Sequence, residues 1–126
     1  MSKGSLGAAQ LVAFAATTDL DVSHAFYDGV LGLERVEASS FANAYDVAGT
    51  QLRVTRVERL AGAPYTVLGW RVVDIEATVA ALRAAGVAFH RYAGIEQDEH
   101  DTWRAPGGSR IAWFADPDAN VLSLQQ

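Results

Sequence analysis

Hydrophobic positions recur at helical spacing in two parts of the chain, and each part carries residues that favour a helix start and stop. The first predicted helix begins at Thr18 or Asp19, either of which can act as an N-cap, and it ends at Gly32. The second spans 74–86 and ends at Gly86. The apolar stripe of the first helix is Val22, Ala25, Phe26, Val30 and Leu31, and that of the second is Ile75, Val79 and Leu82.

Apolar or alternating segments between turn residues predict strands in the remainder of the chain. A stretch with Gly62 and Pro64 close together, 60–65, is typical of a linker. A long polar loop is expected at 93–108, and it can include a short strand at Thr102–Arg104. The predicted strands are 10–18, 33–38, 41–49 and 51–58 before the linker, and 65–73, 87–92, 109–116 and 120–125 after it.

The order of one strand, one helix and further strands therefore occurs twice. Asp19 and Asp74, at the two strand-to-helix junctions, are 55 positions apart, and the helix-ending Gly32 and Gly86 are 54 apart. This near-constant offset predicts an α+β fold: one domain, 1–126, built from a βαβββ module at 8–60 and a second at 65–126. The alternative is a ferredoxin-like α+β domain with extra strands.

Composition excludes several classes of protein. The chain has 126 residues, a formal net charge of −5 and no cysteine, so neither a nucleic-acid-binding surface nor a disulfide or thiolate metal site is expected. No apolar run reaches the roughly 20 residues of a membrane helix. The first ten residues lack the apolar stretch of a signal peptide, so we expect a cytoplasmic protein without membrane or nucleic-acid partners.

Two motifs resemble the vicinal-oxygen-chelate superfamily, also called the glyoxalase, bleomycin-resistance and extradiol-dioxygenase fold. They are the helix end Phe26-Tyr27…Leu31-Gly32-Leu33 and the turn DPDAN at 116–120, in which Ala119 replaces the usual glycine. The resemblance extends from about Gln10 to Gln125. It implies two modules whose mixed sheets curl around a shared cavity, and often a homodimer. Members include metal-dependent lyases, isomerases and dioxygenases, as well as metal-free proteins that sequester drugs.

The resemblance implies metal ligands at three positions that this chain fills with Val12, Val67 and Ser123. A fourth lies on the strand that includes 52–57, which contains no His, Asp or Glu. Valine cannot bind a metal, and a serine hydroxyl is a poor ligand for Zn²⁺, Fe²⁺ or Mn²⁺. We therefore expect no metal and no other cofactor.

Other groups offer little support for metal or nucleophilic chemistry. Nothing in the sequence brings His24, His90 and His100 together, and the acidic stretch 98–101 is expected to be a solvated loop. No serine forms a motif with His and Asp partners, and the glycines of 105–110 precede no helix that could hold a phosphate.

Strand alternation places aliphatic and aromatic residues, with a few polar ones, on the face that the resemblance assigns to the cavity. Phe14, Tyr45 and Trp113 are candidate aromatic walls, although each can also be ordinary core. One of Arg53 and Arg56 can hold a carboxylate or enolate there, and the alternative is an exposed edge arginine. The expected cavity positions are Val12, Phe14 and Ala16, then Val67, Gly69 and Arg71, then Val121, Ser123 and Gln125.

The 93–108 loop holds further candidates. Gln97 and Trp103 are candidate ligand contacts, with Trp103 as a lid or as an anchor of the loop. Glu99 and His100 are candidate catalytic residues, because a carboxylate beside an imidazole can form an acid–base pair. Adjacent residues on a strand point to opposite faces, which argues against joint action.

Three functions follow as hypotheses. The first is a metal-independent protein that binds a small, partly aromatic molecule in the cavity, without the activity of a metal-dependent glyoxalase or dioxygenase. The alternative is a metal-free lyase or isomerase that uses acid–base residues of the 93–108 loop. In the third, side chains fill the cavity and the chain is mainly a dimerising or regulatory module.

Overall fold

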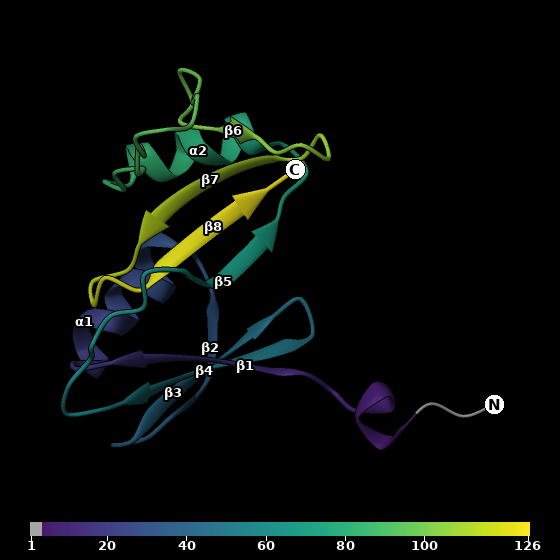
Figure 1. Ribbon diagram of the computed structural model, residues 1–126. Helices are drawn as coiled ribbons and strands as arrows, with labels where there is room; N and C mark the ends of the chain where they lie inside the picture. The colour runs from purple at the N-terminus through teal and green to yellow at the C-terminus, as the bar shows by residue number, and fades with distance from the viewer. Residues whose placement is uncertain (1–3) are drawn as a thin grey trace. The chain divides into compact units, whose positions relative to one another are not determined.

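The computed structural model describes residues 4–126, and the chain divides into two compact units. The first unit extends to Arg59 and the second from Leu60 to Gln126, so the division falls at the start of the linker-like stretch 60–65. Within the described residues each unit contains one four-stranded sheet and one helical segment after its first strand (Figure 1). The predicted α+β fold of two tandem modules is confirmed.

The sheet of the first unit has the strand order β1-β4-β3-β2. β1 is parallel to β4, whereas β3 is antiparallel to both of its neighbours. A short 3₁₀ turn, η1, precedes the sheet. The elements are η1 (Ser5–Ala8), β1 (Val12–Thr17), α1 (Leu20–His24), η2 (Ala25–Val30), β2 (Glu34–Ala38), β3 (Ala42–Val47) and β4 (Thr50–Arg56).

The second unit repeats this topology with the order β5-β8-β7-β6. β5 is parallel to β8, and β7 is antiparallel to both β8 and β6. The elements are β5 (Thr66–Arg71), α2 (Ile75–Ala84), β6 (Trp103–Arg104), β7 (Arg110–Ala115) and β8 (Val121–Gln125). Across residues 4–126, no helix combines the length and the apolar character that crossing a bilayer requires.

The predicted strand at 87–92 is wrong. The segment is extended beside β7, where the His90 N–H donates to the Trp113 carbonyl at 2.8 Å. The side chain of Gln97 forms hydrogen bonds with the backbone of this segment. Its Oε1 accepts from the Tyr92 N–H, and its Nε2 donates to the His90 carbonyl. A side chain thus takes the place of a strand partner, and only the short β6 continues the sheet.

The first helix begins and ends where the sequence predicts, but it buries different residues. The Asp19 carboxylate caps it by accepting from the N–H groups of Asp21 and Val22. From Ala25 the chain makes a π turn, which adds a residue to the turn and breaks the 3.6-residue spacing. Ser23 and Tyr27, four residues apart on one face, are buried, while Val22 is 50% exposed. Gly32, with φ of +74°, closes the helix.

The second helix agrees better with its pattern. Asp74 caps α2 by accepting from the Ala77 N–H at 3.1 Å. Ile75 and Val79 are fully buried and Leu82 is half-buried, as the stripe predicts. Gly86, with φ of +97°, follows the helix end.

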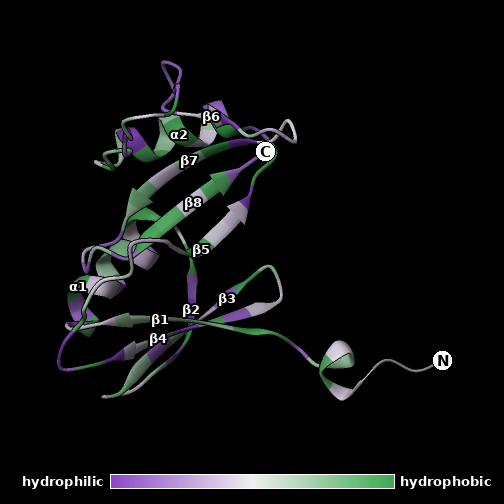
Figure 2. Cartoon of the chain, in the orientation of Figure 1, coloured by the Kyte–Doolittle hydropathy of each residue, from purple (hydrophilic) through white to green (hydrophobic). Residues whose placement is uncertain are grey.

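Each sheet has two distinct faces because side chains alternate along its strands. In the first unit α1 lies against β3 and β4, and we call this side the helix face. Its core includes Leu52, Val54 and Tyr45, all at most 2% exposed. The opposite, open face carries Phe14, which is 60% exposed, and Glu34 and Glu37 of β2, a strand with hydrophilic residues in Figure 2.

The second sheet shows the same division. Phe114 of β7 and Leu122 and Leu124 of β8 form the core of its helix face, and much of β8 is hydrophobic in Figure 2. Arg110, on the same face of β7, donates to Glu76 of α2 at 2.9 Å. The open face carries the alternate residues of β7 and β8, of which Trp113 and Ser123 are register partners.

Candidate functional site

The open face of the second sheet has a row of residues of very different size. Gly69, Ser123 and Trp113 are register partners across β5, β8 and β7. A Cβ atom on Gly69 would lie 2.8 Å from the Ser123 hydroxyl oxygen, so a side chain there would displace that group. The Ser123 hydroxyl therefore occupies the space that a side chain at position 69 would need, and within residues 4–126 no hydrogen-bond partner is seen for it.

Aromatic rings border this row. The rings of Trp103 and Trp113 lie 6.0 Å apart between centroids, tilted by 32°. Tyr92 meets Trp113 edge to face at 5.4 Å, and its hydroxyl lies 3.0 Å from Nδ1 of His90. Trp103 lies on the same open face. Its register partner is Ile111, whose own partner on β8 is Gln125, and Gln125 is two residues from Ser123 and therefore on the same side of the sheet. These half-exposed rings offer a surface on which a planar molecule can stack.

The positions that could hold a family-type metal have no suitable donors. Val12 lies on the open face of β1, Ser123 on that of β8, and Val67 at the irregular register of β5. On β4 the open-face residues are Gln51, Arg53 and Thr55, the register partners of alternate β1 residues. Neither a carboxylate, an imidazole nor a thiolate is present in this set, so these residues do not fit a transition metal.

Phe14 and Arg53 lie together on the open face of the first sheet, where they are register partners. Arg53 forms an ion pair with Glu37 of β2 at 3.5 Å. Arg56, by contrast, pairs in register with the buried Thr17 and is exposed at the strand end. Arg53 is thus on the open face and Arg56 is not, because residues three apart on a strand face opposite ways.

Tyr45 does not present its ring on the open face, which corrects the expectation of an aromatic wall. Its register partner is the core residue Leu52, and the tyrosine is fully buried. The hydroxyl lies 2.9 Å from Nδ1 of His24, and the ring packs against Tyr27 with centroids 5.9 Å apart. Burial raises the pKa of this hydroxyl, against the opposing effect of the Arg35 charge.

Asp98 organises the loop that follows 87–92. Its carboxylate accepts from the hydroxyl and N–H of Thr102, from the N–H of His100 and from the guanidinium of Arg110. Burial alone would raise the pKa of Asp98, but these bonds outweigh it and lower the pKa to about 2. Because Arg110 lies on the helix face, this network is on the opposite side of the sheet from Ser123 and Trp113.

Gln97 and Asp101 complete the same loop. The Gln97 amide bonds the backbone on both sides of the loop, including the carbonyl of Asp101. The Asp101 carboxylate accepts from Arg83 of α2 and from Arg91. Burial raises the pKa of Asp101, but the two arginines more than compensate and lower it. Gln97 thus has a structural explanation that requires no ligand.

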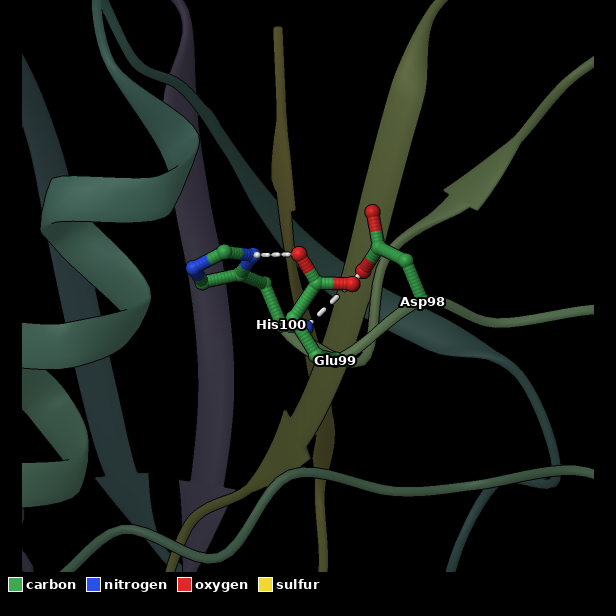
Figure 3. A group of neighbouring side chains, drawn as sticks. All are labelled: Asp98, Glu99 and His100. Carbon is green, nitrogen blue, oxygen red and sulfur yellow. Dashed lines mark hydrogen bonds and ion pairs between the residues drawn. The ribbon is translucent and has the colours of Figure 1, made fainter.

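Glu99 and His100 lie at the tip of this loop. Nδ1 of His100 faces the Glu99 carboxylate at 3.6 Å, and Figure 3 shows the imidazole turned away from Asp98. Nε2 lies 4.0 Å from Glu76 of α2, so the histidine sits between two carboxylates on the helix side. Asp98, Glu99 and His100 have ligand atoms within 4.8 Å, but Asp98 is already occupied by Thr102 and Arg110.

Several residues of the two open faces are not among those that the sequence singled out as contacts. Tyr92 was placed in a strand, and only the ring contacts show it beside Trp113. Glu34 and Asp46 are register partners on the open face of the first sheet. Applying strand alternation to 41–49 would have separated Asp46 from Tyr45, because adjacent residues face opposite ways.

Solved structures with the same fold are numerous. A bleomycin resistance determinant encoded on transposon Tn5 has a TM-score of 0.73 at 19% identity, with 94% of this chain and 97% of that chain covered. Lactoylglutathione lyase from Agrobacterium tumefaciens has a TM-score of 0.72 at 18% identity, with coverage of 93% and 92%. The fosfomycin resistance protein FosX from Listeria monocytogenes has 0.70 at 17%, with 93% and 91% covered.

The comparison with curated protein sequences yields no match. At the identities of the solved structures, similarity shows the fold alone. A family model, however, matches residues 9–124, nearly the whole chain. With its two modules of identical strand order, the chain belongs to the Glyoxalase/Bleomycin resistance protein/Dioxygenase superfamily.

Proposed function

We propose that the protein binds a small, partly aromatic organic molecule on the open face of its second sheet, and that it does so without a metal. The row Gly69–Ser123–Trp113 is the observation that carries this proposal. It combines a hydroxyl without a partner within residues 4–126, a glycine that gives this hydroxyl room, and an aromatic ring. Binding sites for small molecules commonly combine apolar walls with a few polar groups that fix orientation.

The proposed roles follow from the positions of these groups. A planar ligand stacks on Trp113 and Trp103, while the Ser123 hydroxyl donates to or accepts from a polar substituent. Phe14 and Arg53 lie on the open face of the first sheet, and their role as ligand contacts stays a prediction. The absence of donors at Val12, Val67 and Ser123 supports a metal-free mode of binding.

Acid–base catalysis by the 93–108 loop has less support. Gln97 and Asp98 are engaged in holding the loop, and His100 lies against α2 on the other side of the sheet. We therefore propose no catalytic role for Glu99 and His100. The homodimer and the cytoplasmic location stay predictions.

Calorimetric titration with 2-naphthol, and with its saturated analogue decahydro-2-naphthol, tests the proposal. The aromatic probe should bind more tightly, because only it can stack. Trp113→Leu should weaken binding about 10-fold, or about 1.4 kcal/mol, and Ser123→Ala about 3-fold. Tyr45→Phe is the matched control and should leave affinity unchanged, because this ring is in the core.

Elemental mass spectrometry of protein purified without chelator tests metal independence. We expect substoichiometric Zn, Fe, Mn and Ni, and equal 2-naphthol affinity before and after chelator treatment. One equivalent of a transition metal, or affinity that a chelator abolishes and a divalent metal restores, would overturn the metal-free mode. Equal affinity for the two naphthol analogues would overturn stacking.

A further inference from the structure

The open face of the first sheet contains a pocket of about 430 Å³ at the end where the β3–β4 hairpin turns. Its floor includes a row of register partners across the whole sheet, namely Val12, Gln51, Asp46 and Glu34. The pocket belongs to the first unit alone. Its volume is within the range of about 300–1,000 Å³ that is typical of sites for small organic molecules.

One side of this pocket is apolar and accessible. Leu11 is 75% exposed, Val36 is 53% exposed and Val12 is 38% exposed, and all three line the pocket. Val36 lies at the irregular register of β2, next to Glu37. Exposed aliphatic side chains that gather around a concavity can bury the hydrocarbon part of a ligand.

The other side carries an uncompensated negative charge. Glu34 and Asp46 lie directly opposite each other on antiparallel strands, and like charges in this arrangement destabilise a sheet. Within residues 4–126, neither carboxylate forms an ion pair with a basic side chain. Arg53 on the same face is engaged by Glu37, and Arg35, next to Glu34, is on the helix face with Tyr45.

The geometry points to a binding site for a hydrophobic organic cation, with a protonated alkylamine as the simplest form. The ammonium group lies between Glu34 and Asp46, and its hydrocarbon chain lies along Val12, Val36 and Leu11. An ammonium has three N–H donors, and the two carboxylates with the Gln51 amide oxygen offer three acceptors. The cation also relieves the repulsion between the carboxylates. This inference does not depend on the function proposed for the second sheet.

Calorimetric titration at pH 7 with hexylamine, 1-hexanol and hexanoate tests the site. These probes share a hydrocarbon chain and differ in charge. Hexylamine should bind at least 10-fold more tightly than hexanol, and hexanoate should not bind. Added salt should lower the affinity for hexylamine, because it screens the charge interaction. Equal binding of amine and alcohol would overturn the role of charge, and absence of amine binding would overturn the site.

Isosteric variants separate the pocket from general surface charge. Glu34→Gln and Asp46→Asn should each weaken hexylamine 5- to 10-fold, and the double variant should abolish binding. Glu37→Gln is the matched control, because this residue is on the same strand and is paired with Arg53. It should leave affinity unchanged, and an equal loss in this variant would overturn the proposal.

The two sites are distinguishable by variants of the other sheet. Trp113→Leu should weaken the binding of 2-naphthol and leave the affinity for hexylamine unchanged. Glu34→Gln should weaken the binding of hexylamine and leave the affinity for 2-naphthol unchanged. Loss of both ligands in one variant would contradict independent sites. Misfolding is not expected for Glu34→Gln, because it removes repulsion, and a thermal denaturation curve at or above that of the parent protein checks this.

Discussion

The two units of this protein share one topology but present different chemistry on their open faces. Both sheets place a parallel pair beside antiparallel strands, in the orders β1-β4-β3-β2 and β5-β8-β7-β6. At equivalent places in the register, Phe14–Arg53–Ala44 in the first sheet corresponds to Gly69–Ser123–Trp113 in the second. The helix faces maintain the repeated fold, while the open faces can vary because the core does not depend on them.

The two units also differ in how they complete the sheet next to β3 and β7. The first unit uses β2, a strand of 5 residues, whereas β6 in the second has 2. In the second unit, hydrogen bonds of the Gln97, Asp98 and Asp101 side chains fix the loop where the longer strand is lacking. The same position in the fold is thus stabilised by a backbone ladder in one unit and by a polar side-chain network in the other.

The largest expected effect tests the division between the faces. Phe114→Ala should lower the free energy of unfolding by about 3–5 kcal/mol, because this fully buried ring leaves a cavity in the helix-face core. Trp113→Ala, at the neighbouring position on the open face, should lower the free energy of unfolding by only about 1 kcal/mol. Urea denaturation monitored by circular dichroism measures both. Equal losses would contradict the comparison, because the open face would then be part of the core.

An intermediate effect tests the polar network of the second unit. The pKa of Asp98 is lowered to about 2, so the folded state favours the carboxylate, and the associated stability is present above the unfolded pKa of 3.8. It should be lost as the pH falls from about 4 to about 2. The side chain is 36% exposed, so after allowance for screening we expect about 1 kcal/mol.

Asp98→Asn provides the control for this pH dependence. It should lose about 1 kcal/mol at pH 7 and show a shallower decline of stability between pH 4 and 2 than the parent protein. Unfolding free energies from urea titrations across this range make the measurement. An unchanged slope in the variant would assign the acid sensitivity to other carboxylates and would remove the special role of this loop.

The smallest effect concerns the turns before β4 and β8. Ala119 has φ of +65°, in the left-handed region, whereas the β3–β4 turn has Gly49 at its second central position, after Ala48. Ala119→Gly should stabilise the protein by about 0.5 kcal/mol, because relief of backbone strain exceeds the added entropy of the unfolded chain. Ala112→Gly, in the middle of β7, should instead destabilise it by about 1 kcal/mol. Thermal denaturation distinguishes the opposite signs.

The sequence was most informative where local physical chemistry decides structure. The sequence predicts a cap at Thr18 or Asp19 and a helix start at Asp74, and the Asp19 and Asp74 carboxylates are the caps, since a carboxylate satisfies free N–H groups where a helix begins. Period-two alternation separated Ser123 from Leu122, as the register confirms. The offset of 55 positions between the aspartates predicted the repeated module, and residues 9–124 match the family.

Where the pattern failed, contacts distant in sequence were decisive. The residues of 87–92 are typical of a strand, but backbone groups of this segment form hydrogen bonds with the Gln97 side chain and not with a second strand. Tyr45 has no local signal that separates a cavity wall from the core, and its contact with His24 comes from a residue 21 positions away. In the first helix the buried residues are Ser23 and Tyr27, although the apolar pattern predicted Val22 on that face.

The sequence by itself determined the repeat of one strand, one helix and further strands, the lack of a carboxylate or imidazole at Val12, Val67 and Ser123, and the family. These depend on residue type and short-range spacing. Only the tertiary structure decided which polar groups face one another: Glu34 against Asp46, Gly69 beside Ser123, and Asp98 against Arg110. Such pairings depend on strand register and loop closure, in which residues far apart in sequence share one small space.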